Sequence, residues 1–237
     1  MCGIGGYGVM QVYDRKSGRH ESITFLAQAP GSVREGMWED LLEYETRDGF
    51  GFVLKGRINE VGYKSVAVPG SVRGFHHAHQ KYGKLPWKDV LAPAIAMAEN
   101  GYRVQNFEFF YRMSDDSLGR VLTNDKLKHT PDCARLFYEK DGTQRRPGSF
   151  VQNPDLARTL RAIAEGGPDA FYAGEIGQRI AEDFKKNDGF LSAADLKNYE
   201  VAVEKPIWGS YRGHRVAVTP PPNSGAVVLR MLHTLEQ

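Results

Sequence analysis

The sequence predicts a mixed fold of helices and strands, of the α+β type within the broad α/β class. Near both ends, short runs rich in β-branched and aromatic residues are bounded by glycine, as is typical of strands. Between them, apolar residues recur at helical spacing, with capping residues before them and glycine after them. No internal repeat, low-complexity tail or linker interrupts the chain, which predicts one compact unit over residues 1–237.

Composition excludes several classes of protein. The 237 residues carry a formal net charge of +2, which is too small to drive binding to nucleic acid or to a membrane surface. No apolar run is long enough to span a bilayer. The two cysteines, Cys2 and Cys133, cannot form a disulfide framework.

The first elements predicted are two strands, residues 9–13 and 22–25, joined by a polar turn that ends in Gly18. Residues 35–45 have the composition of a short helix. Residues 46–64 carry four glycines and are expected to form an irregular surface segment.

The most strongly punctuated stretch is residues 66–102. A short strand over 65–68 is followed by Ser71, a good N-cap for a helix that reaches Tyr82. A second helix ends at Asn100-Gly101 and carries a wide apolar face, formed by Val90, Leu91, Ala94, Ile95, Met97 and Ala98.

Further helices are predicted by their starts. Residues 106–122 have a helical pattern whose aromatic side chains, Phe107, Phe109, Phe110 and Tyr111, are expected in the core. Asn153-Pro154-Asp155 combines an N-cap, a first-turn proline and a first-turn acid. Another helix begins near Glu175, and Ser192-x-x-Asp195 resembles a capping box.

The last part of the chain is predicted to form strands over 200–206, 208–211 and 215–219, followed by a final helix. Ser224 precedes Gly225 and could be taken for a nucleophile at a turn, but an N-cap explains it fully. The glycines of Gly3–Gly8 match no phosphate-binding pattern and are expected to permit a tight turn or close backbone packing.

Two other features suggest chemistry. Met1-Cys2-Gly3-Ile4 resembles the start of class II glutamine amidotransferases, in which removal of Met exposes a cysteine nucleophile whose own amine is the base. The His-Thr-Arg run of those enzymes is absent. His76 and His79 would share a helix face beside His77, but two ligands do not make a metal site, and a solvated face is the favoured interpretation.

Taken together, a series of short blocks in the same order resembles the gamma-glutamyltranspeptidase (gamma-glutamyltransferase, glutathione hydrolase) family. The blocks are Gly3–Gly8 with Tyr13-Asp14 and Gly18; Ala29-Pro30; Val68-Pro69-Gly70 through Gly74; Tyr82-Gly83; Ala92-Pro93-Ala94; Gly101-Tyr102; Gly166-Gly167-Pro168 with Phe171-Tyr172 and Gly174; Tyr211-Arg212-Gly213; and Pro220–Gly225. They cover nearly the whole chain, which makes the resemblance far more specific than any single block.

The resemblance implies an N-terminal-nucleophile hydrolase, a sandwich of two sheets between helical layers. A precursor cuts itself, and the new N-terminal Thr of the small subunit attacks the gamma-glutamyl amide and forms an acyl-enzyme. Backbone donors hold the oxyanion. This chain resembles a helix-rich, incomplete large subunit without the Thr-Thr-His start of the small subunit, so it is expected to be inactive alone and to hold no catalytic residue, metal or cofactor.

The resemblance also places the substrate site. The family's D-F-R-E-x-A-P segment aligns with Thr24–Pro30, so Leu26 and Gln28 are the expected substrate-binding residues. Leu26 replaces the Arg that pairs with the glutamyl α-carboxylate, and Ala27 replaces the following acid. Each charge-assisted hydrogen bond of that pair contributes roughly 1.5–3 kcal/mol. Its loss predicts altered acyl specificity, because the nearby Arg34 belongs to the family's usual pattern and is not expected to compensate.

Three hypotheses follow. The first is part of a gamma-glutamyltransferase-like enzyme acting on gamma-glutamyl or related amides, such as glutathione, whose partners are the small-subunit portion of the same precursor and that small-molecule substrate. The second is a non-catalytic scaffold or binding protein, and the third is the Cys2 glutaminase. No nucleic-acid partner is expected. Export to the periplasm or the extracellular space is implied by the resemblance alone.

Overall fold

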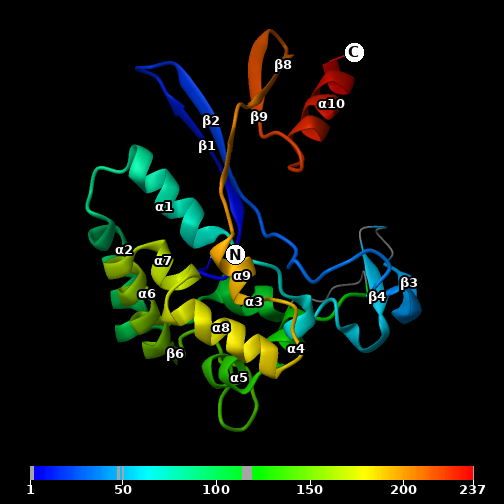
Figure 1. Cartoon of the computed structure of the whole chain (residues 1–237), viewed down its shortest axis with the longest axis vertical. Helices are drawn as coiled ribbons and strands as arrows, with labels where there is room; N and C mark the ends of the chain where they lie inside the picture. Colours follow the sequence, from blue (N-terminus) through cyan, green and yellow to red (C-terminus); the bar gives the residue numbers. More distant parts are fainter. Residues whose placement is uncertain (1–2, 47–48, 50, 114–118, 237) are drawn as a thin grey trace. The chain divides into compact units, whose positions relative to one another are not determined.

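The computed structural model describes residues 3–46, 49, 51–113 and 119–236. Its helices and strands group into two compact units (Figure 1). Unit 1 comprises residues 1–28, 68–84 and 198–237, and unit 2 comprises residues 29–67 and 85–197. The expectation of one domain over 1–237 stays a prediction.

Unit 1 is built on a three-stranded antiparallel sheet in the order β1-β2-β7. The strands are β1 (Gly8–Asp14), β2 (Arg19–Phe25) and β7 (Ala202–Glu204). The predicted hairpin is confirmed, with Gly8 opposite Phe25 and Asp14 opposite Arg19. Asp14 closes the turn by accepting hydrogen bonds from the Lys16 N–H and the Ser17 hydroxyl.

Helix α1 (Ser71–Tyr82) packs on this sheet, and the contact forms the core of unit 1. The buried side chains are Ile23, Phe25 and Ala78, surrounded by Met10, Val12, Phe75, Tyr82 and Val201. Period-two alternation along β1 and helical spacing along α1 bring these apolar residues together. The helix begins where predicted, but its N-cap is Gly70, and Ser71 is fully buried as the first helical residue.

The rest of unit 1 is a hairpin with a helix on it. Strands β8 (Ile207–Tyr211) and β9 (His214–Val218) pair antiparallel, and α10 (Gly225–Glu236) lies beside them (Figure 1). A Cβ at Gly225 would collide with the Thr219 carbonyl, which explains a glycine at the helix start. The predicted strands and final helix are confirmed.

Unit 2 is mainly helical. Its helices are α2 (Trp87–Asn100), α3 (Asn106–Met113), α4 (Thr123–Lys128), α5 (Pro131–Phe137), α6 (Pro154–Gly166), α7 (Pro168–Tyr172), α8 (Glu175–Lys186) and α9 (Ala193–Lys197). Two short antiparallel pairs accompany them, β3 (Leu42–Glu45) with β4 (Phe52–Leu54) and β5 (Tyr102–Arg103) with β6 (Phe150–Val151). Single 3-10 turns cover Glu39–Leu41, Lys55–Arg57 and Tyr63–Ser65.

The capping predictions in unit 2 are confirmed. The Asn153 side chain accepts a hydrogen bond from the Leu156 N–H at the start of α6. Ser192 and Asp195 form a reciprocal capping box before α9, in which the Asp195 carboxylate accepts from the Ser192 N–H at 2.8 Å and the Ser192 hydroxyl accepts from the Asp195 N–H at 3.2 Å. Helices α2 and α6 pack together, and the Trp87 indole N–H donates to the Ile163 carbonyl at 3.1 Å.

Segment 35–45 is not a helix. Gly36 has a φ of +73°, which interrupts any helix there, and the chain forms only the 3-10 turn before entering β3. Residues 46–64 are not wholly irregular either, because β4 pairs with β3 and buries Val53 and Leu54.

Two further predictions are wrong. Residues 65–68 form no strand, since Val68 makes one isolated bridge and the following Pro69 has no N–H to extend a ladder. The helix predicted over 106–122 covers Asn106–Met113 as α3; residues 114–118 lie outside the described residues, and residues 119–122 are not helical. The aromatic side chains expected in the core are largely outside it, since Phe107, Phe110 and Tyr111 are 79%, 67% and 44% exposed. The buried face of α3 carries Arg112 instead, whose guanidinium lies 4.2 Å from the centre of the Phe137 ring.

Among the described residues, no helix combines the length and the apolar character that crossing a membrane requires.

Candidate functional site

The two predicted substrate-binding residues follow directly after β2. Leu26 is half-buried and Gln28 is exposed. The Gln28 N–H donates to the Val68 carbonyl at 3.2 Å, and the Val68 N–H donates to the Gln28 carbonyl at 2.8 Å. The Gln28 side-chain amide reaches the Glu200 carbonyl at 3.4 Å. Residues 26–28 are therefore held by the segments before α1 and before β7.

Tyr199 anchors residues 26–28 through a buried hydrogen bond. It is 1% exposed, and its hydroxyl donates to the Leu26 carbonyl at 2.8 Å. Burial raises the pKa of Tyr199 to about 12, although the Arg73 guanidinium lowers it. Arg73 in turn donates to the Tyr199 carbonyl at 2.8 Å. The tyrosine therefore stays protonated and acts as a hydrogen-bond donor at any physiological pH.

Gly70 explains why the chain carries Val68-Pro69-Gly70 here. A Cβ at Gly70 would collide with the Tyr199 hydroxyl and with the Phe25 carbonyl. The Gly6 carbonyl accepts hydrogen bonds from the Gly70 and Ser71 N–H groups, at 2.9 and 3.0 Å. This confirms close backbone packing as a role of the N-terminal glycine loop. It also satisfies donors at the start of α1.

The side chains of segment 24–28 carry no formal charge. Leu26 is aliphatic, and Ala27 adds only a methyl group. The Thr24 hydroxyl is engaged with Glu204 at 3.3 Å. A carboxylate needs a cation or several N–H donors to leave water. The side chains of segment 24–28 supply only the Gln28 amide for such a role, so they suit a less polar group than an α-carboxylate.

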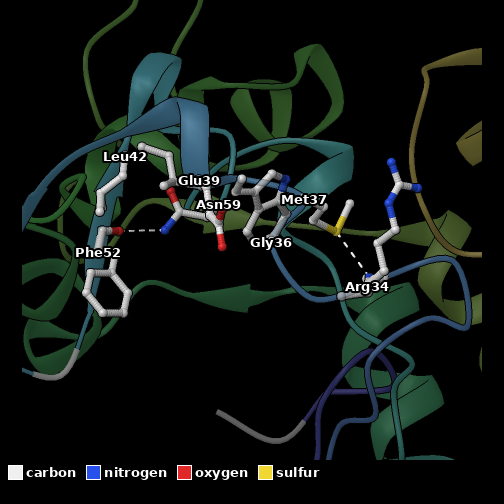
Figure 2. A pocket seen from close by; sticks show the side chains of 10 residues that line it. Arg34, Gly36, Met37, Glu39, Leu42, Phe52 and Asn59 are labelled. Carbon is white, nitrogen blue, oxygen red and sulfur yellow. Dashed lines mark hydrogen bonds between the residues drawn. The ribbon is translucent and has the colours of Figure 1, made fainter.

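Arg34 belongs to unit 2 and lines a cavity of about 390 Å³ there. The walls are mainly apolar, from Val33, Met37, Trp38, Leu42, Phe52 and Leu54, with Glu39 and Asn59 among them. Figure 2 shows the Asn59 amide donating to the Phe52 carbonyl, at 2.7 Å, and the Arg34 N–H directed to the Met37 sulfur, at 3.4 Å. The Arg34 guanidinium extends away from the other labelled side chains (Figure 2).

The segment that carries Arg34 is anchored within unit 2. The Asp195 carboxylate accepts from the Gly31 N–H at 2.8 Å, and the Ser32 hydroxyl donates to the Phe190 carbonyl at 3.1 Å. Trp38 contacts the Phe190 ring, with the centroids 6.1 Å apart. Sequence patterns identified the Ser192–Asp195 box but not that it holds residue 31.

The other candidate residues are the three histidines of α1, Ser224 and Cys2. His76, His77 and His79 are half-buried, so the expected solvated face is wrong, and Nε2 of His77 is enclosed by protein. No cluster of three metal-ligating side chains occurs within the described ranges. Ser224 is exposed directly before α10. Cys2 lies outside the described residues.

Sequence reasoning did not predict the contacts that Tyr199 and Gly70 make at this site. The Val68-Pro69-Gly70 block was a usable signal for Gly70. A glycine that precedes a helix and is not needed for a turn suggests that another part of the chain packs closely against its backbone. Tyr199 carried no comparable signal, since its hydrogen bond joins residues 173 positions apart in the chain.

Comparison with known proteins agrees with these findings. The family model described as Gamma-glutamyltranspeptidase matches residues 1–237. The chain is 35% identical over 235 residues to human Glutathione hydrolase 7, covering 99% of this chain and 32% of that protein. It is 35% identical over 244 residues to the Acylase ACY 1 proenzyme of Pseudomonas sp. (strain SE83), covering 100% of this chain and 40% of that protein.

The fold is similar as well. The crystal structure of Helicobacter pylori gamma-glutamyltranspeptidase matches with a TM-score of 0.84 and 28% identity, over 98% of this chain and 62% of that one. The likeness confirms the predicted fold class of mixed helices and strands related to the N-terminal-nucleophile hydrolases. The chain spans 32% to 40% of the length of these curated relatives. With its full length matched by the family model, the chain belongs to the gamma-glutamyltranspeptidase family.

Proposed function

We propose that this chain is the large-subunit part of an enzyme that transfers or hydrolyses the acyl group of gamma-glutamyl or related amides. The nucleophile is an N-terminal Thr in the small-subunit portion of the same precursor, outside these residues. The α-amine of this Thr takes the hydroxyl proton as the hydroxyl oxygen attacks the amide carbon. The amide C–N bond then breaks, the leaving amine receives that proton, and an acyl-enzyme remains. Water or an acceptor amine then takes the acyl group.

Membership of the family and the names of relatives support catalysis over a scaffold or binding role. One similar protein is named a glutathione hydrolase and another an acylase, and the word proenzyme supports a self-cut precursor. The Cys2 glutaminase receives no such support, and it predicts that alkylating Cys2 abolishes glutamine hydrolysis.

The observation that carries the acyl preference is Leu26. Its half-buried aliphatic side chain cannot form the two parallel hydrogen bonds that an Arg makes with a carboxylate. Binding of a gamma-glutamyl α-carboxylate is therefore weakened by one to several orders of magnitude, using roughly 1.5–3 kcal/mol per charged hydrogen bond. The favoured substrate is an amide whose acyl group is less polar at this end.

The test uses the full-length protein that contains this chain. A gamma-glutamyl anilide and an anilide with an uncharged aliphatic acyl chain of similar length are assayed side by side. We expect Leu26→Arg to raise kcat/KM for the gamma-glutamyl anilide at least about tenfold and to lower it for the aliphatic one. Leu26→Met, which keeps the apolar character, is the matched control.

Efficient turnover of the gamma-glutamyl anilide by the unaltered protein, unchanged in Leu26→Arg, would overturn the altered acyl preference. If neither anilide is turned over, catalysis itself is excluded and the binding or scaffold role takes its place.

A further inference from the structure

We propose that Tyr199 is a positioning residue that sets acyl specificity by fixing the backbone at Leu26. The inference rests on the proposed function, because it assigns a role within the acyl site. Tyr199 is separated from Leu26 by 173 positions, yet its hydroxyl donates to the Leu26 carbonyl at 2.8 Å. Three observations indicate that this bond orients the segment rather than merely filling space.

The first observation is that Leu26 has left the strand ladder. Strand β2 ends at Phe25, and the register of β2 with β1 and β7 covers residues 19–25 and 22–24. The Leu26 carbonyl is therefore not held by a neighbouring strand, and the Tyr199 hydroxyl supplies its hydrogen bond. A change in the ψ angle of Leu26 would turn this carbonyl and, with it, the direction in which the chain continues through Ala27 to Gln28. The hydrogen bond to the Leu26 carbonyl therefore restrains the course of residues 26–28.

The second observation is that the hydroxyl has no room to move. The ring is 1% exposed, the Arg73 guanidinium holds the Tyr199 carbonyl at 2.8 Å, and Gly70 approaches so closely that a Cβ there would meet the hydroxyl. A donor fixed at both its backbone and its ring transmits its position to its acceptor.

The third observation is that the same short stretch of chain anchors the other predicted site residue. The carbonyl of Glu200, the next residue after Tyr199, accepts from the Gln28 side-chain amide at 3.4 Å. Residues 199–200 thus contact Leu26 through a side chain and Gln28 through the backbone. A change at Tyr199 is expected to move both site residues together, which a space-filling role would not require.

The experiment compares Tyr199→Phe with Tyr138→Phe in the full-length protein. Tyr138 is a buried tyrosine of unit 2, 5% exposed, whose hydroxyl donates to the Asn124 carbonyl at 2.8 Å and also lies against the side-chain oxygen of Asn124. Each substitution removes one hydroxyl donor and keeps the ring, so both should lower thermal stability to a comparable extent. Only the loss at Tyr199 should reach the acyl site.

For Tyr199→Phe we expect KM for the preferred anilide to rise about fivefold to tenfold, the equivalent of one lost hydrogen bond, while kcat changes less than KM. The ratio of kcat/KM for the aliphatic anilide to kcat/KM for the gamma-glutamyl anilide should fall by a similar factor. Tyr138→Phe should leave KM and the preference unchanged. Amide hydrogen exchange at Gln28 and Val68 should be faster in Tyr199→Phe only.

If Tyr199→Phe does not fold, 3-fluorotyrosine at position 199 replaces it. This residue keeps the ring and makes the hydroxyl a stronger hydrogen-bond donor, so the proposal predicts a lower KM, and an unchanged or raised KM would overturn it. Turnover with unaltered KM and unaltered acyl preference in Tyr199→Phe, or a KM effect matched by Tyr138→Phe, would overturn the positioning role alone. Absence of turnover by the unaltered protein would overturn the proposed function and this role with it.

Discussion

The end of β2 in unit 1 and the β3–β4 pair in unit 2 are both short strand regions rich in apolar residues, but they are packed very differently. Ile23 and Phe25 are 0% and 3% exposed, and a Cβ added at Gly8, Gly70 or Gly74 would lie within 3.0 Å of a Phe25 atom. In the β3–β4 pair Val53 and Leu54 are buried, but Leu42, Tyr44 and Phe52 are 52%, 49% and 56% exposed. The comparison shows that an apolar side chain on a strand becomes buried only where another element packs against that face of the strand.

The largest expected difference in stability between the two regions comes from truncating a buried side chain at the end of β2. Ile23→Ala removes a fully buried side chain from the core under α1, so the free energy of unfolding should fall by about 3 kcal/mol. Leu42→Ala, at a half-exposed position of β3, should cost under about 0.5 kcal/mol. Urea unfolding followed by far-UV circular dichroism measures both. Equal losses would mean that the two regions are equally packed in solution.

A second test adds atoms instead of removing them. Gly70→Ala places a methyl group against the Phe25 carbonyl, which is backbone and cannot yield, so we expect a loss of about 2 kcal/mol. Gly5→Ala belongs to the same unit and meets nothing within 4 Å, and it should be close to neutral. A Gly70→Ala protein as stable as Gly5→Ala would refute the close approach.

The smallest effect concerns the anchor of residues 29–34. Burial alone would raise the pKa of Asp195, but hydrogen bonds from the Ser192 hydroxyl and from the Gly31 and Ser192 N–H groups outweigh it and lower the pKa. Because the folded pKa is depressed, the stabilisation is fully present above the unfolded value of about 3.9. It is lost as the pH falls through the folded value.

Asp195→Ala should therefore destabilise the protein by about 1 kcal/mol at pH 7, as loss of a cap does. The gap from the unaltered protein should shrink on acidification below pH 4. Thermal melts from pH 7 to pH 3 measure this, with the exposed Asp40→Ala as the control. A gap that is independent of pH would show that the carboxylate charge contributes nothing.

Local chemistry made part of the fold predictable. The Asp14 turn, the Asn153 cap and the Ser192–Asp195 box each satisfy their hydrogen bonds within three residues, so their sequences suffice to locate them. The prediction of a helix over residues 35–45 was wrong because Gly36 adopts a positive φ, which composition does not reveal. Helix α3 forms as predicted over 106–113, but the expected aromatic core does not, because its buried face carries Arg112, which an apolar pattern cannot anticipate.

The candidate site shows the same division. Resemblance located Leu26 and Gln28, since the aligned segment is continuous in the chain. The partners that hold them, Val68, Tyr199 and Glu200, come from two other stretches, and their contacts depend on how the chain folds back. Such long-range hydrogen bonds leave no periodic signal in a single sequence.

Gly74 restricts how the sequence can evolve. It lies within α1, where alanine would favour the helix by about 1 kcal/mol, yet a Cβ there would collide with the Phe25 ring. A lineage that acquires alanine at position 74 therefore needs a smaller side chain at position 25 at nearly the same time. The effects of substitutions at positions 25 and 74 on stability are therefore expected to be strongly non-additive. Alanine at position 74 should be tolerated only after Phe25 has been replaced by a smaller residue.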